Sequence, residues 1–227
     1  LNEEALSTAI DLKYIVRLGT GMDNVDFNIT NQKGIEVENT PNAHIDGVAE
    51  LALGGILNSL RSIAWNDHQI KSGNWIKPMG SLLKGKTIGL IGLGKIAKRL
   101  AILLNPFMCN ILAYDPNFDE EFANKWGIQK TSLDTILENS DIISLHLPFS
   151  VENKHIINNA SFTKMKKDVL IVNTSRGGLV NESALFDFLK NNSSAKAYLD
   201  TFEEEPYKGN LCHLSNVLMT GHIGTYA

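Results

Sequence analysis

The sequence predicts an α/β fold built on a doubly wound parallel sheet, and two patterns support this. From residue 86 onward, short β-rich runs alternate with segments of helical periodicity, as in consecutive βαβ units. Most of these runs are continuously apolar, which is typical of strands buried on both faces. The expected strands are Thr87–Leu93, Asn110–Tyr114, Asp141–Leu147, Val169–Asn173, Ala195–Leu199 and Val217–Thr220, and the expected helices are Ile96–Leu104, Leu133–Asn139, Ala160–Lys164 and Glu182–Asn191.

A long helical pattern precedes this region, from about Ile45 to Lys71, and has a broad apolar face. Such a face fits a core helix and an interface helix of a homodimer equally well, and we predict a homodimer. Before it, Tyr14–Arg17 and Ile35–Glu38 are expected strands around a turn-rich stretch. The predicted division is therefore a remnant of a separate unit at residues 1–40, a large domain at 41–222 that includes the long helix, and the start of a return to the first unit at 223–227.

Composition excludes several classes of protein. With 227 residues, 43% of them hydrophobic and 20% charged, the chain has the composition of an ordinary globular protein. The net charge of −4 argues against nucleic acid as a partner, because phosphate binding needs clustered Lys and Arg. No stretch approaches the roughly 20 apolar residues of a membrane span, and no signal pattern is visible, so a cytoplasmic location is expected. The chain begins at Leu1 and stops at Ala227 without a terminating pattern, and we expect both ends to be cut.

The motif Gly92-Leu93-Gly94-Lys95-Ile96-Ala97 lies between an expected strand and an expected helix. In this context Gly92 allows a tight turn, Gly94 lets the backbone approach a pyrophosphate, and Ala97 permits close packing of the helix on the strand. The amides of Lys95 and Ile96 would lie at the helix N-terminus, where the helix dipole favours phosphate. The motif predicts a Rossmann-type dinucleotide site.

Asp115 follows the next expected strand, about 20 residues after the glycines, where an acid accepts hydrogen bonds from the adenosine ribose. The same carboxylate would repel a 2′-phosphate, and the following Pro116 and Asn117 supply no arginine to bind one. The predicted cofactor is therefore NAD rather than NADP.

Four further polar residues are expected at the same edge of the sheet, because ligands bind outside the carboxyl ends of parallel strands. Arg176, Asp200 and His222 each follow an expected strand, and Glu205 stands in the acidic run after Asp200. Hydride transfer at a carbon bearing oxygen needs a proton donor or acceptor, which histidine supplies. A nearby carboxylate orients an imidazole and favours its charged form, and an arginine holds a carboxylate. Together the four predict a hydride-transfer site.

The remaining histidines are weaker candidates. His146 lies within an apolar strand and is interpreted as a hydrogen-bonded core residue. No convergent partners are visible for His44, His68, His155 and His213, and nothing in the sequence argues for a metal.

Several motifs in one order resemble the D-isomer-specific 2-hydroxyacid dehydrogenase family over nearly the whole chain. They are Arg17–Asp26, Asn39-Thr40-Pro41 with Val48-Ala49-Glu50, Gly85–Gly94, Asp141–Pro148, Val172–Gly178, Leu199–Pro206 and His222-Ile223-Gly224. The resemblance implies a second, flavodoxin-like substrate domain, of which this chain holds only a remnant, and a small 2-hydroxy or 2-keto acid as substrate. The sequence around Arg17–Asp26 and the final residues Gly-Thr-Tyr-Ala are most similar to members of the phosphoglycerate dehydrogenase type.

The resemblance also implies roles for the matched positions. His222 would be the general acid/base, Glu205 its partner, and Arg176 the anchor of the substrate's carboxylate and keto oxygen. Asp200 would hold the nicotinamide carboxamide, and the backbone of Thr20 and Gly21 would bind the substrate carboxylate. The residues expected to line the cofactor in addition to the glycine motif and Asp115 are Leu147, Pro148, Thr174, Ser175, Arg176, Asp200, His222 and Gly224.

Three alternatives stay open at this point. Formate dehydrogenases of the same fold carry glutamine where Glu205 stands, which argues against them, but phosphite dehydrogenases share the catalytic trio. The family's transcriptional corepressor relatives also keep the trio, so a non-catalytic NAD(H)-responsive interaction protein is the second hypothesis. A third is an inactive cofactor-domain fragment.

Overall fold

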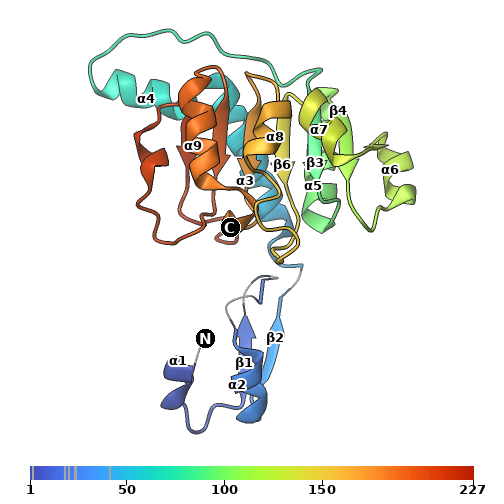
Figure 1. Cartoon of the computed structure of the whole chain (residues 1–227), viewed down its shortest axis with the longest axis vertical. Coiled ribbons are helices and arrows are strands. Elements are labelled where there is room, and N and C mark those ends of the chain that lie inside the picture. Colours follow the sequence, from blue (N-terminus) through green and yellow to red (C-terminus); the bar gives the residue numbers. More distant parts are fainter. Residues whose placement is uncertain (2, 18, 20, 23–24, 41) are drawn as a thin grey trace.

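The computed structural model describes residues 1–227 except 2, 18, 20, 23–24 and 41. The described strands form a two-stranded sheet near the N-terminus and a seven-stranded sheet in the rest of the chain. In Figure 1 the small unit stands apart from the large domain, to which it is joined through the segment before Ile45.

The small unit contains α1 (Glu3–Ser7), β1 (Tyr14–Arg17), α2 (Phe27–Gln32) and β2 (Glu36–Asn39). Its two strands are parallel, with Tyr14 opposite Glu36. The carboxylate of Asp26 caps α2 by accepting from the amides of Asn28 and Ile29. The first strand has the predicted bounds and the second begins one residue later than predicted.

The large sheet is parallel throughout, as the apolar runs predicted. Its strands, in the order in which they lie side by side, are β5 (Gln129–Lys130), β4 (Asn110–Tyr114), β3 (Thr87–Ile91), β6 (Ile142–Leu145), β7 (Leu170–Asn173), β8 (Lys196–Leu199) and β9 (Val217–Met219). The chain winds outward in one direction from β3 and in the other from β6. These two neighbours form the topological switch point, where open α/β sheets bind their ligands.

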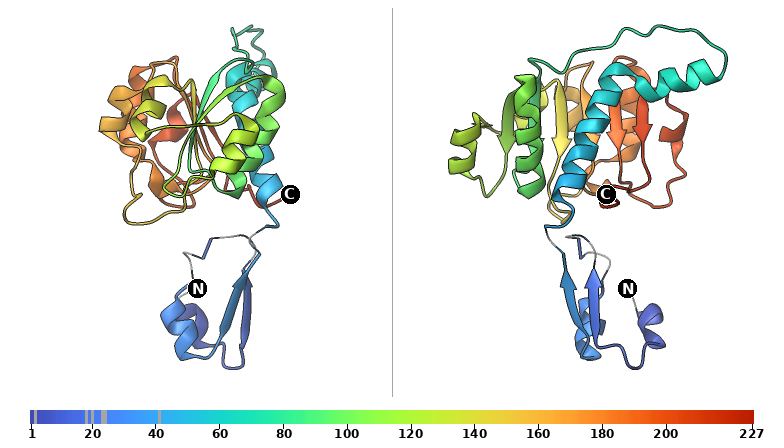
Figure 2. Two further views of the ribbon diagram at one scale, coloured as in Figure 1. Left: turned by 90° about the vertical axis from the view of Figure 1, so that its right-hand side faces the viewer. Right: turned by 180° about the vertical axis from the view of Figure 1, so that it is seen from behind.

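Helices cover both faces of this sheet, as Figure 2 shows when the sheet is seen along its edge. One face packs against α3 (Ile45–Arg61), α5 (Lys95–Leu104) and α6 (Glu120–Trp126), and the other against α7 (Leu133–Asn139), α8 (Asn159–Lys164) and α9 (Glu182–Asn191). Short 3₁₀ turns lie at Asn105–Phe107, Gly177–Leu179 and Asn210–His213. The doubly wound, three-layered fold is therefore confirmed.

The single helix predicted from Ile45 to Lys71 is wrong: the structure has α3 and a separate α4 (Ile63–Lys71). The break is at Ser62, whose φ of 52° is left-handed and incompatible with a continuous helix. The side-chain oxygen of Asn58 accepts from the amide of Ala64, and Lys196 donates to the Ser59 carbonyl and the Ser62 hydroxyl. These polar groups replace the missing helical hydrogen bonds, so α4 leaves the body of the domain.

The sequence reading also missed α6 and β5. Asp119 caps α6 by accepting from the amide of Phe122, and Gly127 ends the helix with a φ of 66°. An acid cap, two glutamates in the first turn and a terminal glycine are a helix signature that could have been found. Among the described residues, no helix has the length and apolar character needed to cross a membrane.

Candidate active site

The glycine turn after β3 lies at the switch point. Gly92 has a φ of 98°, and a Cβ there would come within 2.8 Å of the His146 carbonyl carbon and 2.9 Å of the Leu147 amide nitrogen, just after β6. Only glycine allows the backbones of the two central strands to approach this closely at their carboxyl ends. The turn thus lies at the carboxyl edge of the sheet, where open α/β folds bind dinucleotides.

The start of α5 is exposed at the same edge of the sheet. Gly94 precedes the helix, and no described side chain caps it by hydrogen bonding. A Cβ at Gly94 would meet nothing within 4 Å, so there is open space at the residue that precedes the first helical residues, Lys95 and Ile96. The Lys95 ammonium donates a 2.7 Å hydrogen bond to the side-chain oxygen of Asn42. Open amides at a helix N-terminus fit a pyrophosphate.

Asp115 lies immediately after β4 and is bound to the same turn. One carboxylate oxygen accepts from the amide of Leu93 at 2.6 Å, and the other accepts from the amide of Asn117 at 2.7 Å. The half-buried carboxylate therefore lies beside the glycine turn, in the position predicted for the ribose-binding acid.

The ends of β6 and β7 lie next to the glycine turn on the same edge of the sheet. The Ser175 hydroxyl donates to the Leu147 carbonyl at 2.6 Å, which joins the two strand ends, and Pro148 follows on the surface. The buried Thr174 hydroxyl has no hydrogen-bond partner among the described residues. A buried hydroxyl without a partner is costly unless a ligand satisfies it. Together with the open helix start, this residue set fits a bound dinucleotide.

His222 and Glu205 are brought together by the loops after β9 and β8. Nδ1 of His222 lies 2.9 Å from Oε2 of Glu205, and both side chains are about four-tenths exposed, at 39% and 38%. The other oxygen of Glu205 accepts from the amide of Phe202 at 3.1 Å. His222 has a φ of 57°, which is uncommon for a residue with a side chain. The imidazole is thus fixed through Nδ1 and keeps Nε2 for a ligand.

Asp200 holds the loop in this conformation. Its Oδ1 accepts from the Thr220 hydroxyl at 2.6 Å and from the amide of Ile223 at 2.9 Å, and its Oδ2 accepts from the amide of Gly224 at 3.0 Å. The residue is only 1% exposed. The carboxylate therefore fixes the residues on both sides of His222.

Arg176 follows β7, on the same edge of the sheet. Its Nη1 donates to the carbonyl of Ser175 at 2.8 Å, and the side chain of Asn173 donates to the carbonyl of Arg176 at 2.9 Å. His44 is 9% exposed, and the positive charge of Arg176 acts on it. Burial lowers the pKa of His44, and Arg176 lowers it further. The prediction that His44 lacks convergent partners is therefore wrong, because only the tertiary fold brings it within the electrostatic influence of Arg176.

Two other histidines have partners that the structure makes clear. Nε2 of His146 lies 2.9 Å from the Ser144 hydroxyl, which confirms the predicted hydrogen bond, but the residue is half-buried and follows β6, which ends at Leu145. The prediction that His155 lacks convergent partners is wrong, because its Nε2 lies 3.1 Å from a carboxylate oxygen of Glu203. No group of three or more His, Cys, Asp or Glu in the described part of the chain is placed to hold a metal ion.

The two residues predicted to bind the substrate carboxylate lie in the small unit. Thr20 is outside the described residues, and Gly21 is half-buried in a segment without regular structure. The backbone of neighbouring Gly19 donates to the Thr40 hydroxyl at 2.9 Å, and a Cβ on Gly19 would lie 3.7 Å from the Thr225 methyl group. This segment therefore comes close to the chain just after His222.

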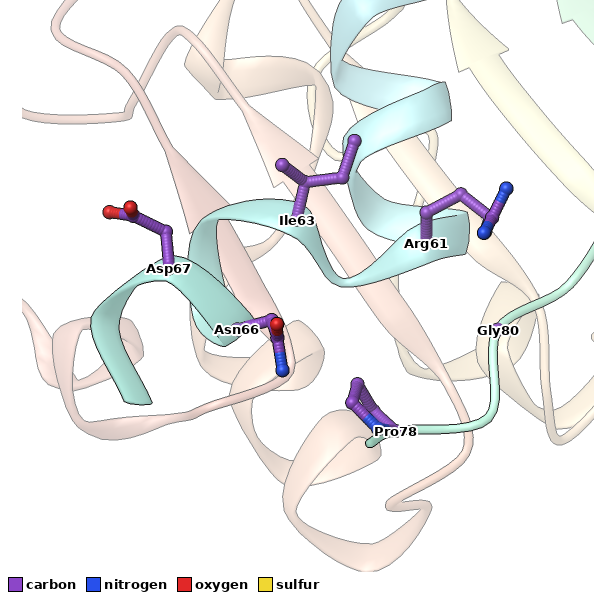
Figure 3. Close-up of a pocket in the computed structure, with 6 residues that line it drawn as sticks. All are labelled: Arg61, Ile63, Asn66, Asp67, Pro78 and Gly80. Carbon is purple, nitrogen blue, oxygen red and sulfur yellow. The ribbon is translucent and has the colours of Figure 1, made fainter. Parts of the chain in front are cut away.

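A cavity of about 500 Å³ lies elsewhere, between α4 and the segment that follows it. Figure 3 shows Asn66 and Pro78 facing one another across it, with Arg61 and Gly80 at one side. None of the predicted site residues lines this cavity, so it is separate from the predicted site.

The glycine turn, the open helix start and the acid after β4 define a dinucleotide-binding domain, and the residues after β7, β8 and β9 add a polar cluster at the same edge. The chain belongs to the D-isomer specific 2-hydroxyacid dehydrogenase family. The family's NAD binding domain matches residues 53–224. NAD is therefore the cofactor of this domain.

Individual relatives support the same family. The chain is 39% identical over 227 residues to the D-3-phosphoglycerate dehydrogenase of Archaeoglobus fulgidus, covering 98% of this chain and 43% of that protein. It is 43% identical over 220 residues to the hydroxypyruvate reductase of Thermotoga maritima, covering 94% of this chain and 71% of that protein. The chain thus spans less than half of the first relative and about seven-tenths of the second.

A solved structure supports the same family. The D-lactate dehydrogenase of Aquifex aeolicus, complexed with NAD and lactic acid, superimposes with a TM-score of 0.86 at 31% identity. The match covers 100% of this chain and 74% of that one.

Proposed function

We propose that the protein is an NAD-dependent oxidoreductase that transfers a hydride between nicotinamide and a small D-2-hydroxy acid or its 2-keto acid. The observation that carries the proposal is the His222–Glu205 pair at 2.9 Å, on the sheet edge that also holds the glycine turn and Arg176. A proton-transferring pair beside a dinucleotide crevice is what oxidation of an alcohol carbon requires.

Bound NAD supplies the hydride acceptor, and NADH the donor. In the reducing direction His222 gives a proton to the substrate's keto oxygen as the carbon receives the hydride, and in the oxidising direction it takes that proton back. Glu205 orients the imidazole through Nδ1, which leaves Nε2 to face the substrate. Arg176 holds the substrate carboxylate and polarises the keto oxygen, for which its planar cation is suited.

Asp200 has fewer unused hydrogen-bond acceptor positions than the cofactor-binding role implied by the resemblance would suggest. Its carboxylate already accepts three hydrogen bonds, from Thr220, Ile223 and Gly224. A carboxylate offers about four acceptor positions, so one remains for the nicotinamide carboxamide. We propose that Asp200 mainly fixes the His222 loop and uses the remaining position for the cofactor.

The small unit is proposed to be part of a flavodoxin-like substrate domain, with residues 1–40 on one side and 223–227 leading back to it. Thr20 and Gly21 would contribute backbone amides to the substrate carboxylate. The names of the relatives suggest 3-phosphoglycerate, glycerate and glycolate, with the corresponding keto acids, as substrates to be compared.

The test is NADH consumption by the full-length protein with glyoxylate, hydroxypyruvate, its 3-phosphate and pyruvate. We expect turnover with at least one of them and a loss of at least about 100-fold in His222→Ala, with the Kd for NADH retained. Cofactor binding without turnover of any 2-keto acid would contradict the enzymatic proposal and favour the corepressor-like alternative. The cytoplasmic location expected from the sequence stays a prediction.

We further propose that a second copy of this chain covers the arm formed by α4 and residues 72–82. Large apolar side chains on the arm are exposed: Ile63, Ile70, Trp75, Ile76, Met79 and Leu82. Trp75 is 79% and Met79 96% exposed, and the neighbouring cavity of about 500 Å³ has room for a side chain from outside. A patch that holds both projecting side chains and a cavity can pair with itself across a two-fold axis.

Sedimentation velocity tests this homodimer. We expect the full-length protein to sediment as a dimer and the double variant Trp75→Lys/Met79→Glu as a monomer. Val151→Lys, at an 85% exposed apolar residue outside the arm, is the control and should leave the dimer intact. A double variant that stays dimeric would place the interface elsewhere.

A further inference from the structure

Two acids next to the proposed site, Glu182 and Glu203, bind each other's backbone. The amide of Glu203 donates to Oε1 of Glu182 at 2.7 Å, and the amide of Glu182 donates to Oε1 of Glu203 at 3.0 Å. Glu182 is the first residue of α9, and Glu203 lies in the loop after β8. The pair therefore joins the start of a helix to the loop that carries Glu205.

A requirement for capping α9 does not explain Glu182. Asn181 already caps the helix, since its side-chain oxygen accepts from the amide of Ala184 at 2.9 Å. The carboxylate of Glu182 is directed instead to the amide of Glu203, on another segment. Its hydrogen bond therefore serves the loop after β8 rather than the helix.

The same loop is in close contact with the residue after Arg176. A Cβ on Gly177 would lie 1.8 Å from the carbonyl carbon of Phe202 and 2.3 Å from the amide nitrogen of Glu203. The two backbones touch, so any shift of residues 202 and 203 changes the space beside Arg176. A rigid loop at this position relates Arg176 to Glu205.

Glu203 is also bound from a third segment. Its Oε2 lies 3.1 Å from Nε2 of His155, and Nδ1 of that ring lies 3.5 Å from the side-chain nitrogen of Asn181. Two residues further on, Glu205 accepts from Phe202 and meets His222. These hydrogen bonds and the short backbone segment 202–205 together connect α9 to the imidazole.

This arrangement has an electrostatic cost. Burial raises the pKa of Glu182, and the negative charges of Glu203 and Glu205 raise it further, whereas the amide of Glu203 and His155 lower it. Three carboxylates are thus held in a small volume although their charges repel. The hydrogen bonds that Glu182 and Glu203 exchange offset this repulsion.

We infer that Glu182 is a positioning residue of the hydride-transfer site: it fixes the Glu203 backbone so that Glu205 meets His222 and the loop packs beside Arg176. The inference rests on the proposed function. Glu182 acts through its hydrogen bond to an amide, and that requirement determines which substitutions preserve its role.

Kinetics of three variants of the full-length protein test this. Glu182→Ala removes the acceptor, and Glu182→Asp withdraws it by one methylene. In both variants we expect kcat to fall about tenfold or more, while the Kd for NADH stays within twofold of wild type. Glu182→Gln keeps an oxygen that can accept from the Glu203 amide, and kcat should stay within about threefold of wild type. Asp187→Ala removes an exposed acid from the same helix and should leave kcat unchanged.

Wild-type kcat in Glu182→Asp, or equal losses in the Gln and Asp variants, would overturn the inference. Because Asp keeps the negative charge at the start of α9, loss in that variant cannot come from the helix dipole.

A second measurement does not depend on turnover. The ring resonances of His222, assigned with His222→Asn, should move in the Asp variant and not in the Gln variant. If the wild-type protein consumes no NADH with any keto acid, the proposed function fails, and this NMR comparison still decides whether Glu182 positions His222. Unmoved resonances in the Asp variant would refute the positioning role.

Discussion

The amide of Leu93 donates a 2.6 Å hydrogen bond to the carboxylate of Asp115, which ties the glycine turn to the end of β4. Asp115 therefore shapes the turn, and we propose that it also binds the adenosine ribose. We expect Asp115→Ala to weaken NADH binding about tenfold or more, and Asp115→Asn less, since its amide oxygen can still accept from Leu93. Calorimetric titration with NADH and NADPH measures this. An unchanged Kd for NADH in the alanine variant would contradict the assignment.

Replacing Asp200 should disturb the loop that carries His222. In Asp200→Asn one oxygen becomes an NH₂ group that cannot accept, so the variant loses either the bonds from Thr220 and Ile223 or the bond from Gly224. Because the site is buried, we expect a loss of about 1–3 kcal/mol in the free energy of unfolding. The kcat should fall as well. Urea unfolding and steady-state kinetics provide the two measurements, and a variant with wild-type values in both would show that the loop does not depend on this carboxylate.

Gly55 on α3 should not tolerate a methyl group, whereas its neighbour should. A Cβ on Gly55 would lie 1.9 Å from the ring of the buried Tyr198, but a Cβ on Gly54 would meet nothing within 4 Å. We expect Gly55→Ala to destabilise the protein by about 2–3 kcal/mol. Gly54→Ala should stabilise it by up to about 1 kcal/mol, because alanine is the better helix former. Similar unfolding midpoints for the two variants would contradict the close packing of α3 on β8.

The lowered pKa of His146 predicts that the free energy of unfolding depends on pH. Burial lowers the pKa of His146 to about 4, whereas an unfolded histidine has a pKa of about 6.5. The unfolded state therefore takes up a proton first as the pH falls, and stability is lost between these two values. The contribution between pH 7 and pH 5 is at most about 2 kcal/mol, since part of the residue remains exposed.

The comparison with His146→Gln isolates this contribution from other titrating groups. The variant keeps a side chain that can accept from Ser144, and its free energy of unfolding should fall less between pH 7 and pH 5 than that of wild type. Parallel losses in the two proteins would mean that His146 titrates normally.

The sequence was sufficient for those parts of the fold that have a strong local pattern. The bounds of β4, α7 and α9 agree with the prediction because each is an apolar or periodic run with polar ends. The glycine turn and the acid after β4 also follow from local spacing, and the carboxyl-end rule brought Arg176, Asp200, Glu205 and His222 to one edge.

What the sequence could not supply depends on contacts between distant segments. The break at Ser62 is stabilised by Lys196, which lies far along the chain. The local helical periodicity therefore does not reveal the break. The proximity of His44 to Arg176 and of His155 to Glu203 likewise arises only after folding. Periodicity records which face of a segment is apolar, not which partner covers it.

The short strand β8 links the arm that contains α4 to the loop that carries His222. At its amino end, Lys196 binds the junction of α3 and α4 and so sets the direction of the arm. Directly after its carboxyl end, Asp200 holds the loop around His222. Between them Tyr198 packs on α3, and its hydroxyl lies 3.0 Å from that of Thr220. Residues 196–200 therefore link the proposed subunit contact to the proposed reaction centre, so a change that alters one surface is expected to require compensation in the other.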